Sequence, residues 1–173
     1  MIKSKEARRR AEAILEMLKI SQAPIDVFAI AKQLGFEVVE YDFPDDTSAA
    51  LVIDEDIKAI GINKNHALTR QRFSVAHELG HFLQGHGDFA NSQKTFEDGS
   101  FNYADPQNRQ ELEANEFAAE LLMPSMILKK EPELTTLDVP SLAKKYQVSE
   151  QALWIQLINL HLVNPEQDIS KVF

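Results

Sequence analysis

The amino-acid sequence predicts an α+β domain with two N-terminal helices, a small, mainly antiparallel sheet, and a series of helices after the sheet. Hydrophobic residues recur at a spacing near 3.6 toward both ends of the chain, whereas between residues 36 and 62 they alternate as in strands. A length of 173 residues suits one compact domain with a helical extension. We therefore expect residues 1–125 to form the main domain and residues 126–173 a helical C-terminal unit packed on it.

The two N-terminal helices and the strands have distinct signals. The first helix is expected over residues 5–19. The second is expected to have Pro24 in its first turn, where a proline is tolerated, and to end at Gly35. Strands are expected at residues 36–43, 50–53 and 58–62. The short polar stretch between the last two predicts an antiparallel hairpin.

Helical spacing returns after the strands. One long helix is expected over residues 67–83, and a second over residues 108–123, where Pro124 ends it. The segment between them is rich in Gly, Asn, Asp and Ser, and long segments of this kind often carry function. Its Tyr103 is a candidate for stabilising an oxyanion. Shorter helices are expected at residues 126–130, 139–146 and 149–162.

Composition argues against several classes of function. The chain has no cysteine, so disulfides and thiolate metal ligands are excluded. The formal net charge of −9 argues against a general affinity for nucleic acid, and we expect no DNA binding. No apolar run approaches the roughly 20 residues that cross a bilayer, and the N-terminus lacks the features of a signal peptide. These observations predict a cytoplasmic protein that does not bind membranes.

The stretch FSVAHELGHFLQGH contains an H-E-x-x-H string that begins at His77 and ends at His81. Residues four apart lie on one face of a helix, so both histidines can present an imidazole to one ion. Glu78 is offset by about 100° from His77, which places its carboxylate beside the ion rather than among its ligands. Zinc held by three protein ligands keeps a position for water and lowers the pKa of that water, so a neighbouring carboxylate can act as the general base. The pattern predicts His77 and His81 as ligands and Glu78 as the base.

A third ligand has to come from another segment. His86 is near, but the glycines on both sides of it indicate that the helix has ended. On the helix expected after residue 108, Glu111 and Asn115 share one flank of the apolar stripe. Glu111 can therefore bind the ion while Asn115 hydrogen-bonds a ligating histidine. Three histidines are not expected to be ligands: His66, His86 and His161.

Together, RFSVAHELGHFLQGH and the later motif ELEANEFAAELLMP resemble the ImmA/IrrE family of zinc metallo-endopeptidases. The resemblance also includes IDVFAIAKQLGFEVVEYD and LVIDEDIKAIGIN, and it extends from about residue 8 to residue 125. It implies a gluzincin-like site with His77 and His81 as zinc ligands, Glu78 as catalytic base and a glutamate of the second motif as third ligand. Related peptidases place that glutamate at the first position of E-x-x-A-[DN], which is Glu111 here, and Glu113 is the alternative.

The resemblance implies zinc-dependent cleavage of a regulatory protein, and the expected substrate is a helix-turn-helix transcriptional repressor. Because His and carboxylate ligands accept several ions, Mn²⁺ and Fe²⁺ remain alternatives to Zn²⁺. A different function is also consistent with the sequence, namely a non-catalytic regulatory protein that holds a metal and binds a repressor or DNA.

The C-terminal unit has the helix, turn, helix rhythm of a DNA-binding motif over residues 139–162. Its second helix carries Glu150, Gln151 and Gln156 where a DNA reader would carry basic residues. We therefore interpret the unit as a helical packing module that caps the domain or helps to hold a substrate.

Overall fold

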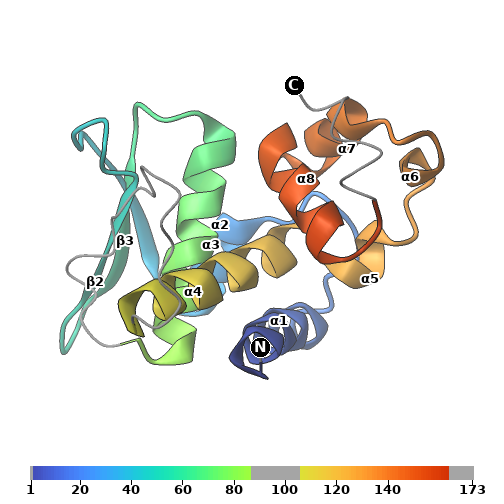
Figure 1. The fold of residues 1–173 in the computed structure, drawn as a ribbon. Helices are drawn as coiled ribbons and strands as arrows, with labels where there is room; N and C mark the ends of the chain where they lie inside the picture. Colours follow the sequence, from blue (N-terminus) through green and yellow to red (C-terminus); the bar gives the residue numbers. More distant parts are fainter. Residues whose placement is uncertain (1, 87–105, 164–173) are drawn as a thin grey trace.

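The computed structural model describes residues 2–86 and 106–163, which form eight helices and a three-stranded sheet (Figure 1). The sheet lies on one side of the molecule, helices α3 and α4 lie next to it, and the C-terminal helices lie on the other side. Tyr103 falls outside the described residues. The α+β class predicted from the sequence is confirmed.

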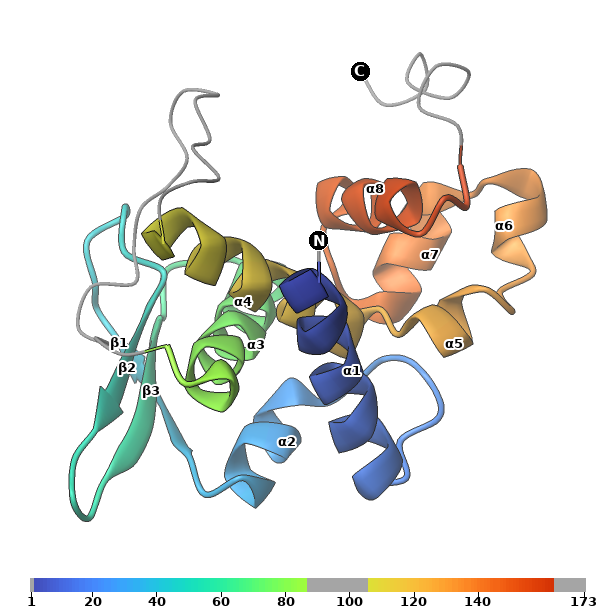
Figure 2. The same cartoon turned by 60° about the horizontal axis from the view of Figure 1, so that its bottom comes forward.

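Helices α1 (Ile2–Met17) and α2 (Val27–Gln33) precede the sheet. Helix α1 lies across α4, as Figures 1 and 2 both show. The expectation that Pro24 lies in the first turn of α2 is wrong. The helix begins three residues later because the carboxylate of Asp26 caps it, accepting a hydrogen bond of 3.0 Å from the Ala29 amide. Gly35 follows the C-cap with a φ of 86°, as expected for a glycine that ends a helix.

The sheet consists of β1 (Glu37–Tyr41), β2 (Ala49–Ile53) and β3 (Lys58–Asn63) in the order β1-β3-β2. The predicted hairpin is present, with β2 antiparallel to β3 and Leu51 opposite Ile60. Strand β1 pairs with the other edge of β3 in parallel, so the small sheet is mixed. The buried Asn63 side chain holds the connection from β1 to β2, because its amide donates to the carbonyls of Phe43, Pro44 and Thr47.

Two long helices, α3 (Leu68–Gln84) and α4 (Pro106–Leu122), pack against each other and carry both sequence motifs. Their contact includes Val75, Leu79, Phe117 and Leu121, which are fully buried in the hydrophobic core. The apolar stripes of both helices therefore fix which of their polar side chains face each other.

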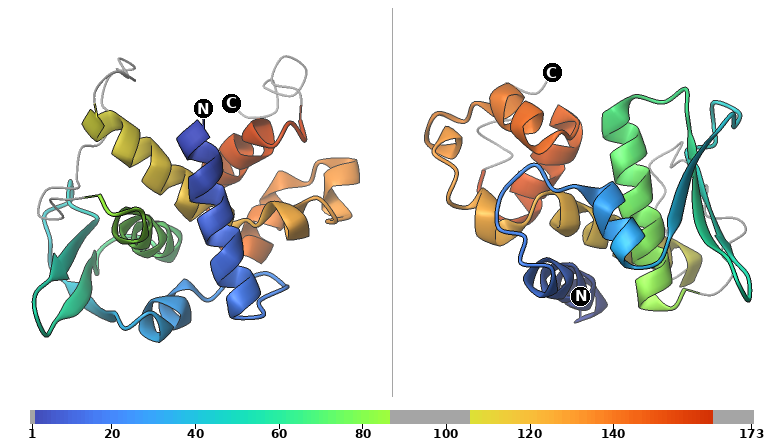
Figure 3. Two further views of the ribbon diagram at one scale, coloured as in Figure 1. Left: turned by 90° about the horizontal axis from the view of Figure 1, so that it is seen from below. Right: turned by 180° about the vertical axis from the view of Figure 1, so that it is seen from behind.

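The C-terminal helices are α5 (Ser125–Leu128), α6 (Glu133–Thr136), α7 (Val139–Tyr146) and α8 (Glu150–Asn159). Both views in Figure 3 show these helices on the side of the molecule away from the sheet. They are connected to the rest of the molecule through polar contacts as well as the core. The buried Gln156 of α8 donates to the Glu120 carboxylate and to the Met123 carbonyl, at 3.2 and 3.1 Å. Across the described residues, no helix combines the length and apolar character needed to cross a bilayer.

Candidate metal centre

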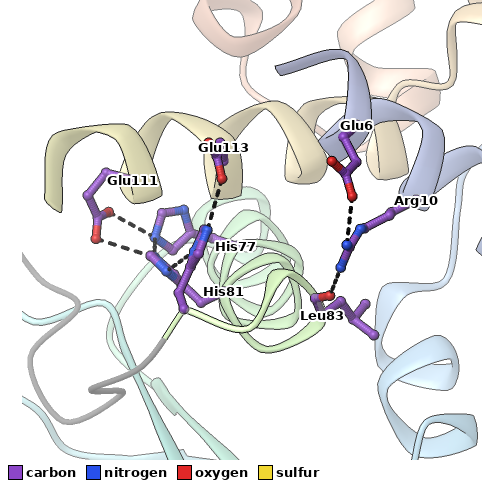
Figure 4. A network of polar contacts seen from close by, with 8 residues as sticks. Glu6, Arg10, His77, His81, Leu83, Glu111 and Glu113 are labelled. Atoms are coloured by element: carbon purple, nitrogen blue, oxygen red, sulfur yellow. Dashed lines mark hydrogen bonds and ion pairs between the residues drawn. The ribbon is translucent and has the colours of Figure 1, made fainter. Parts of the chain in front are cut away.

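His77 and His81 lie one turn apart on α3, and their rings point to the same place (Figure 4). The two Nε2 atoms are 2.9 Å apart. Both side chains are largely buried, with exposed fractions of 13% and 5%. The helical spacing of four residues thus gives the convergence expected from the sequence.

Glu111 of α4 faces this histidine pair (Figure 4). Its Oε2 lies 3.2 Å from Nε2 of His77 and its Oε1 lies 3.3 Å from Nε2 of His81. One ligand atom from each of the three residues lies within 4.8 Å of those of the others. Donors about 2.0–2.1 Å from a tetrahedral zinc ion are separated by about 3.3 Å. The spacing and chemistry of the three groups therefore fit such an ion.

Glu111 and His77 shift each other's pKa values toward the charged forms. Burial would raise the pKa of Glu111, but hydrogen bonds from His77 and His81 outweigh it and lower the pKa to about 2. Burial also lowers the pKa of His77, yet the hydrogen bond that His77 donates to Glu111 and the charges of Glu78 and Glu111 leave that pKa raised. Glu111 is therefore ionised and available as an acceptor at neutral pH.

Glu78 is buried on α3 between the two histidines in sequence, with an exposed fraction of 2%. Its negative charge is among the causes that raise the pKa of His77. Glu78 is not one of the three grouped donors. Its carboxylate is therefore separate from the three candidate ligands.

Asn115, one turn after Glu111 on α4, contacts the outer side of His77. Its Oδ1 lies 2.9 Å from Nδ1 of His77. An amide oxygen can only accept, so Nδ1 carries a proton, and in the neutral ring Nε2 directs its lone pair toward the donor group. The structure thus places Asn115 where the sequence predicts an orienting residue.

His86 and Glu113 are the residues that sequence reasoning underestimated. Nδ1 of His86 lies 3.0 Å from Nδ1 of His81, and Nε2 of His86 lies 3.1 Å from Oε2 of Glu113. Glu113, the alternative third ligand, is therefore engaged with His86 and is not in the donor group. The sequence feature that could have indicated the position of His86 is the preceding glycine, Gly85. Its φ of 69° turns the chain back at the end of α3, so the His86 amide donates to the His81 carbonyl at 3.1 Å.

The two other histidines lie outside helices α3 and α4. His66 contacts the carbonyl of Asp45 at 3.0 Å through Nε2, and His161 is exposed after α8. Neither belongs to the grouped donors. That neither histidine binds the metal stays a prediction.

The end of α3 is fastened to α1. Arg10 of α1 donates to the carbonyl of Leu83 in the last turn of α3 and to Glu6, the latter at 2.8 Å (Figure 4). The carbonyls in the last turn of a helix lack partners within the helix, so an arginine here satisfies one of them. This contact helps to fix the position at which the chain leaves α3 toward His86.

The sequence matches the family described as the IrrE N-terminal-like domain, Peptidase M78, over residues 31–157. A comparison with curated proteins gives no significant match. Among solved structures, the fold is similar to that of a Mycobacterium tuberculosis transcriptional regulator, with a TM-score of 0.63 and 17% identity over 86% of this chain. The match covers 44% of that protein, so this chain spans less than half of its length. At this identity the likeness concerns the fold. The family match includes both motifs of the candidate metal centre, and this chain therefore belongs to the ImmA/IrrE family.

Proposed function

We propose that this protein is a zinc-dependent endopeptidase that cleaves a regulatory protein, with a helix-turn-helix transcriptional repressor as its substrate. The observation that carries the proposal is the convergence of His77, His81 and Glu111, together with a separate buried carboxylate on Glu78, the residue that follows His77 in the sequence. Two imidazoles, a carboxylate ligand and an independent carboxylate base are the groups that metal-assisted peptide hydrolysis requires.

Each residue has a separate role in the proposed reaction. His77, His81 and Glu111 would hold the ion, and Asn115 keeps His77 in the tautomer that leaves Nε2 free. A bound zinc ion would lower the pKa of a water molecule and polarise the scissile carbonyl. Glu78 accepts the proton of the attacking water and returns it to the leaving amine. The same donors also accept Mn²⁺ or Fe²⁺.

The proposed substrate rests on the family of this chain and on the similarity of its fold to that of a protein described as a transcriptional regulator. The C-terminal unit offers limited support for direct DNA binding. Gln156 of α8 is buried against α4, and Lys145 of α7 is paired with Glu131. We propose that the unit, residues 126–173, packs on the peptidase domain rather than reading DNA.

The test is a cleavage assay on the helix-turn-helix repressor encoded next to this protein's gene. Zinc-loaded protein and repressor are incubated, and fragments are identified by mass spectrometry. We expect defined fragments with the unmodified protein and none with Glu78→Gln, which keeps the three ligands and should retain zinc. If Glu78→Gln keeps its zinc and inactivates the repressor as well as the unmodified protein does, the protein acts by binding. Retardation of DNA in a low-salt gel-shift assay would instead support a DNA-binding role.

A further inference from the structure

A carboxylate and a second imidazole stand behind His81, on the side away from the donor group. Oε2 of Glu113 lies 3.1 Å from Nε2 of His86, and Nδ1 of His86 lies 3.0 Å from Nδ1 of His81. We propose that Glu113 and His86 are positioning residues that hold the His81 ring for metal binding. This inference rests on the metal site of the proposed function, but not on peptide cleavage.

The hydrogen bonds permit one proton arrangement when His81 binds a metal through Nε2. With that nitrogen used as a ligand, the His81 proton must sit on Nδ1 and be donated to Nδ1 of His86. His86 then carries its own proton on Nε2 and donates it to the Glu113 carboxylate. Each donor in this chain has an acceptor, so Glu113 selects the tautomer of His86, and His86 selects that of His81.

The chain of contacts is enclosed. His86 is 7% exposed as a residue, and the side chain of Glu113 is 13% exposed. Water therefore has little access with which to replace either partner. The turn at Gly85 fixes the backbone of His86, whose amide is bonded to the His81 carbonyl at 3.1 Å. His86 is thus connected to His81 through both backbone and side chain.

Helix α4 orients both ligating histidines, in two different ways. Asn115 contacts Nδ1 of His77 directly, whereas Glu113 reaches His81 through the interposed ring of His86. Little more than one turn of α4 therefore supplies one candidate metal ligand, Glu111, and two residues that orient the histidines, Glu113 and Asn115. A ligand role for His86 would require breaking these contacts, because both of its ring nitrogens are engaged.

Zinc affinity, measured by competition with a chromogenic chelator in the absence of any substrate, tests the proposal. We expect Glu113→Ala and His86→Ala to weaken zinc binding by about 10- to 100-fold, the usual effect of losing an orienting partner. Glu113→Gln should recover most of the affinity because its amide oxygen still accepts from His86. Glu55→Ala, at an exposed turn position, is the matched control and should bind zinc like the unmodified protein. Unchanged affinity in both alanine variants, or no recovery in Glu113→Gln, would overturn the proposal.

Imidazole NMR gives a second readout that a general packing role would not change. In ¹⁵N-labelled, zinc-loaded protein, we expect protected Nδ1–H signals from both His77 and His81. In His86→Ala the signal of His81 should be lost through exchange with water, whereas that of His77, bonded to Asn115, should remain as an internal control. A His81 protonated on Nε2 would contradict the proposal. Tight zinc binding without repressor cleavage would overturn the peptidase function alone, and absence of zinc binding would overturn both.

Discussion

Gly80 of α3 lies directly against the backbone of Ala114 in α4. A Cβ placed on Gly80 would come within 3.1 Å of both the Cα and the carbonyl oxygen of Ala114. Gly80 precedes His81, and Ala114 precedes Asn115, so the contact lies beside the donor group. The close approach of the two helices at this point is what brings the histidines of one motif within ligand distance of Glu111 in the other.

Gly80→Ala should therefore destabilise the protein although alanine is the better helix former. The overpacked contact costs about 1–3 kcal/mol, and the gain in helix propensity offsets up to about 1 kcal/mol. We expect the free energy of unfolding, measured with urea, to fall by about 1–2 kcal/mol, and zinc affinity to fall with it. Ala114→Gly should not restore stability in the double variant, because the contacts with Ala114 are made by its backbone. If the double variant regained the stability of the unmodified protein, the crowding would instead involve the side chain of Ala114.

Replacing Glu111 and Glu113 in turn should separate a ligand from a positioning residue. Glu111→Ala removes one of three donors, so we expect metal analysis after dialysis to find little bound zinc. Glu113→Ala keeps all three donors and should still reach one zinc per protein when zinc is in excess. The reverse pattern would identify Glu113 as the third ligand, the alternative that the sequence left open.

Asn115→Ala should weaken zinc binding by about 10-fold or more, because Nδ1 of His77 loses the acceptor that fixes its tautomer. Asn115→Asp retains an acceptor oxygen at that position and should bind zinc more tightly than the alanine variant. Isothermal titration calorimetry measures both affinities. Asn159→Ala, at an exposed position of α8, is the matched control. Equal affinities for the alanine variant and the unmodified protein would remove Asn115 from the site.

Local sequence patterns were sufficient for the elements that build the site, but not for all of their partners. The spacing of four between His77 and His81, and between Glu111 and Asn115, already determines which side chains share a helix face. The parallel pairing of β1 depends instead on the path of residues 42–48, which Asn63 holds through side-chain hydrogen bonds. Such a contact between distant residues has no periodic signal.

The pairing of His86 with Glu113 shows the same limit at the site itself. The glycines around His86 predict the end of α3, and the helix does end at Gln84. What the pattern could not show is the direction of the chain after Gly85, which returns the ring to His81. Glu113 joins it from 27 positions away, a distance that only the packing of α4 on α3 bridges.

Arg72 connects helix α3 to two other segments, and its replacement should lower the free energy of unfolding. The buried guanidinium donates to the carbonyls of Ile25 and Gln147, at 2.7 and 3.1 Å. Arg72→Met leaves both carbonyls without this partner, and we expect the free energy of unfolding to fall by about 2–4 kcal/mol in urea. Arg72→Lys should restore little, because one ammonium cannot reproduce the two-armed contact. The exposed Arg70→Met is the matched control, and an equal loss there would contradict this account.

Glu131 should make the stability of the C-terminal unit dependent on pH. Its Oε1 accepts a hydrogen bond of 2.8 Å from the hydroxyl of Tyr146 in α7, and its Oε2 forms an ion pair with Lys145, also in α7. Burial would raise the pKa of Glu131, but the hydrogen bonds from Lys145 and Tyr146 and the Lys145 charge leave it lowered. A lowered pKa in the folded state means that the ionised carboxylate stabilises the fold at neutral pH. This contribution is lost as the pH falls from the unfolded-state pKa, about 4.3, through the lower folded-state pKa.

We expect Glu131→Gln to lower the free energy of unfolding by about 1 kcal/mol at pH 7. The difference from the unmodified protein should shrink as the pH falls below about 4 and should disappear below the folded-state pKa, where both carry an uncharged side chain. Urea unfolding followed by the fluorescence of Trp154 measures this, with the exposed Glu55→Gln as control. A difference that stays constant from pH 7 to pH 3 would show that the charge of Glu131 is not what stabilises the unit.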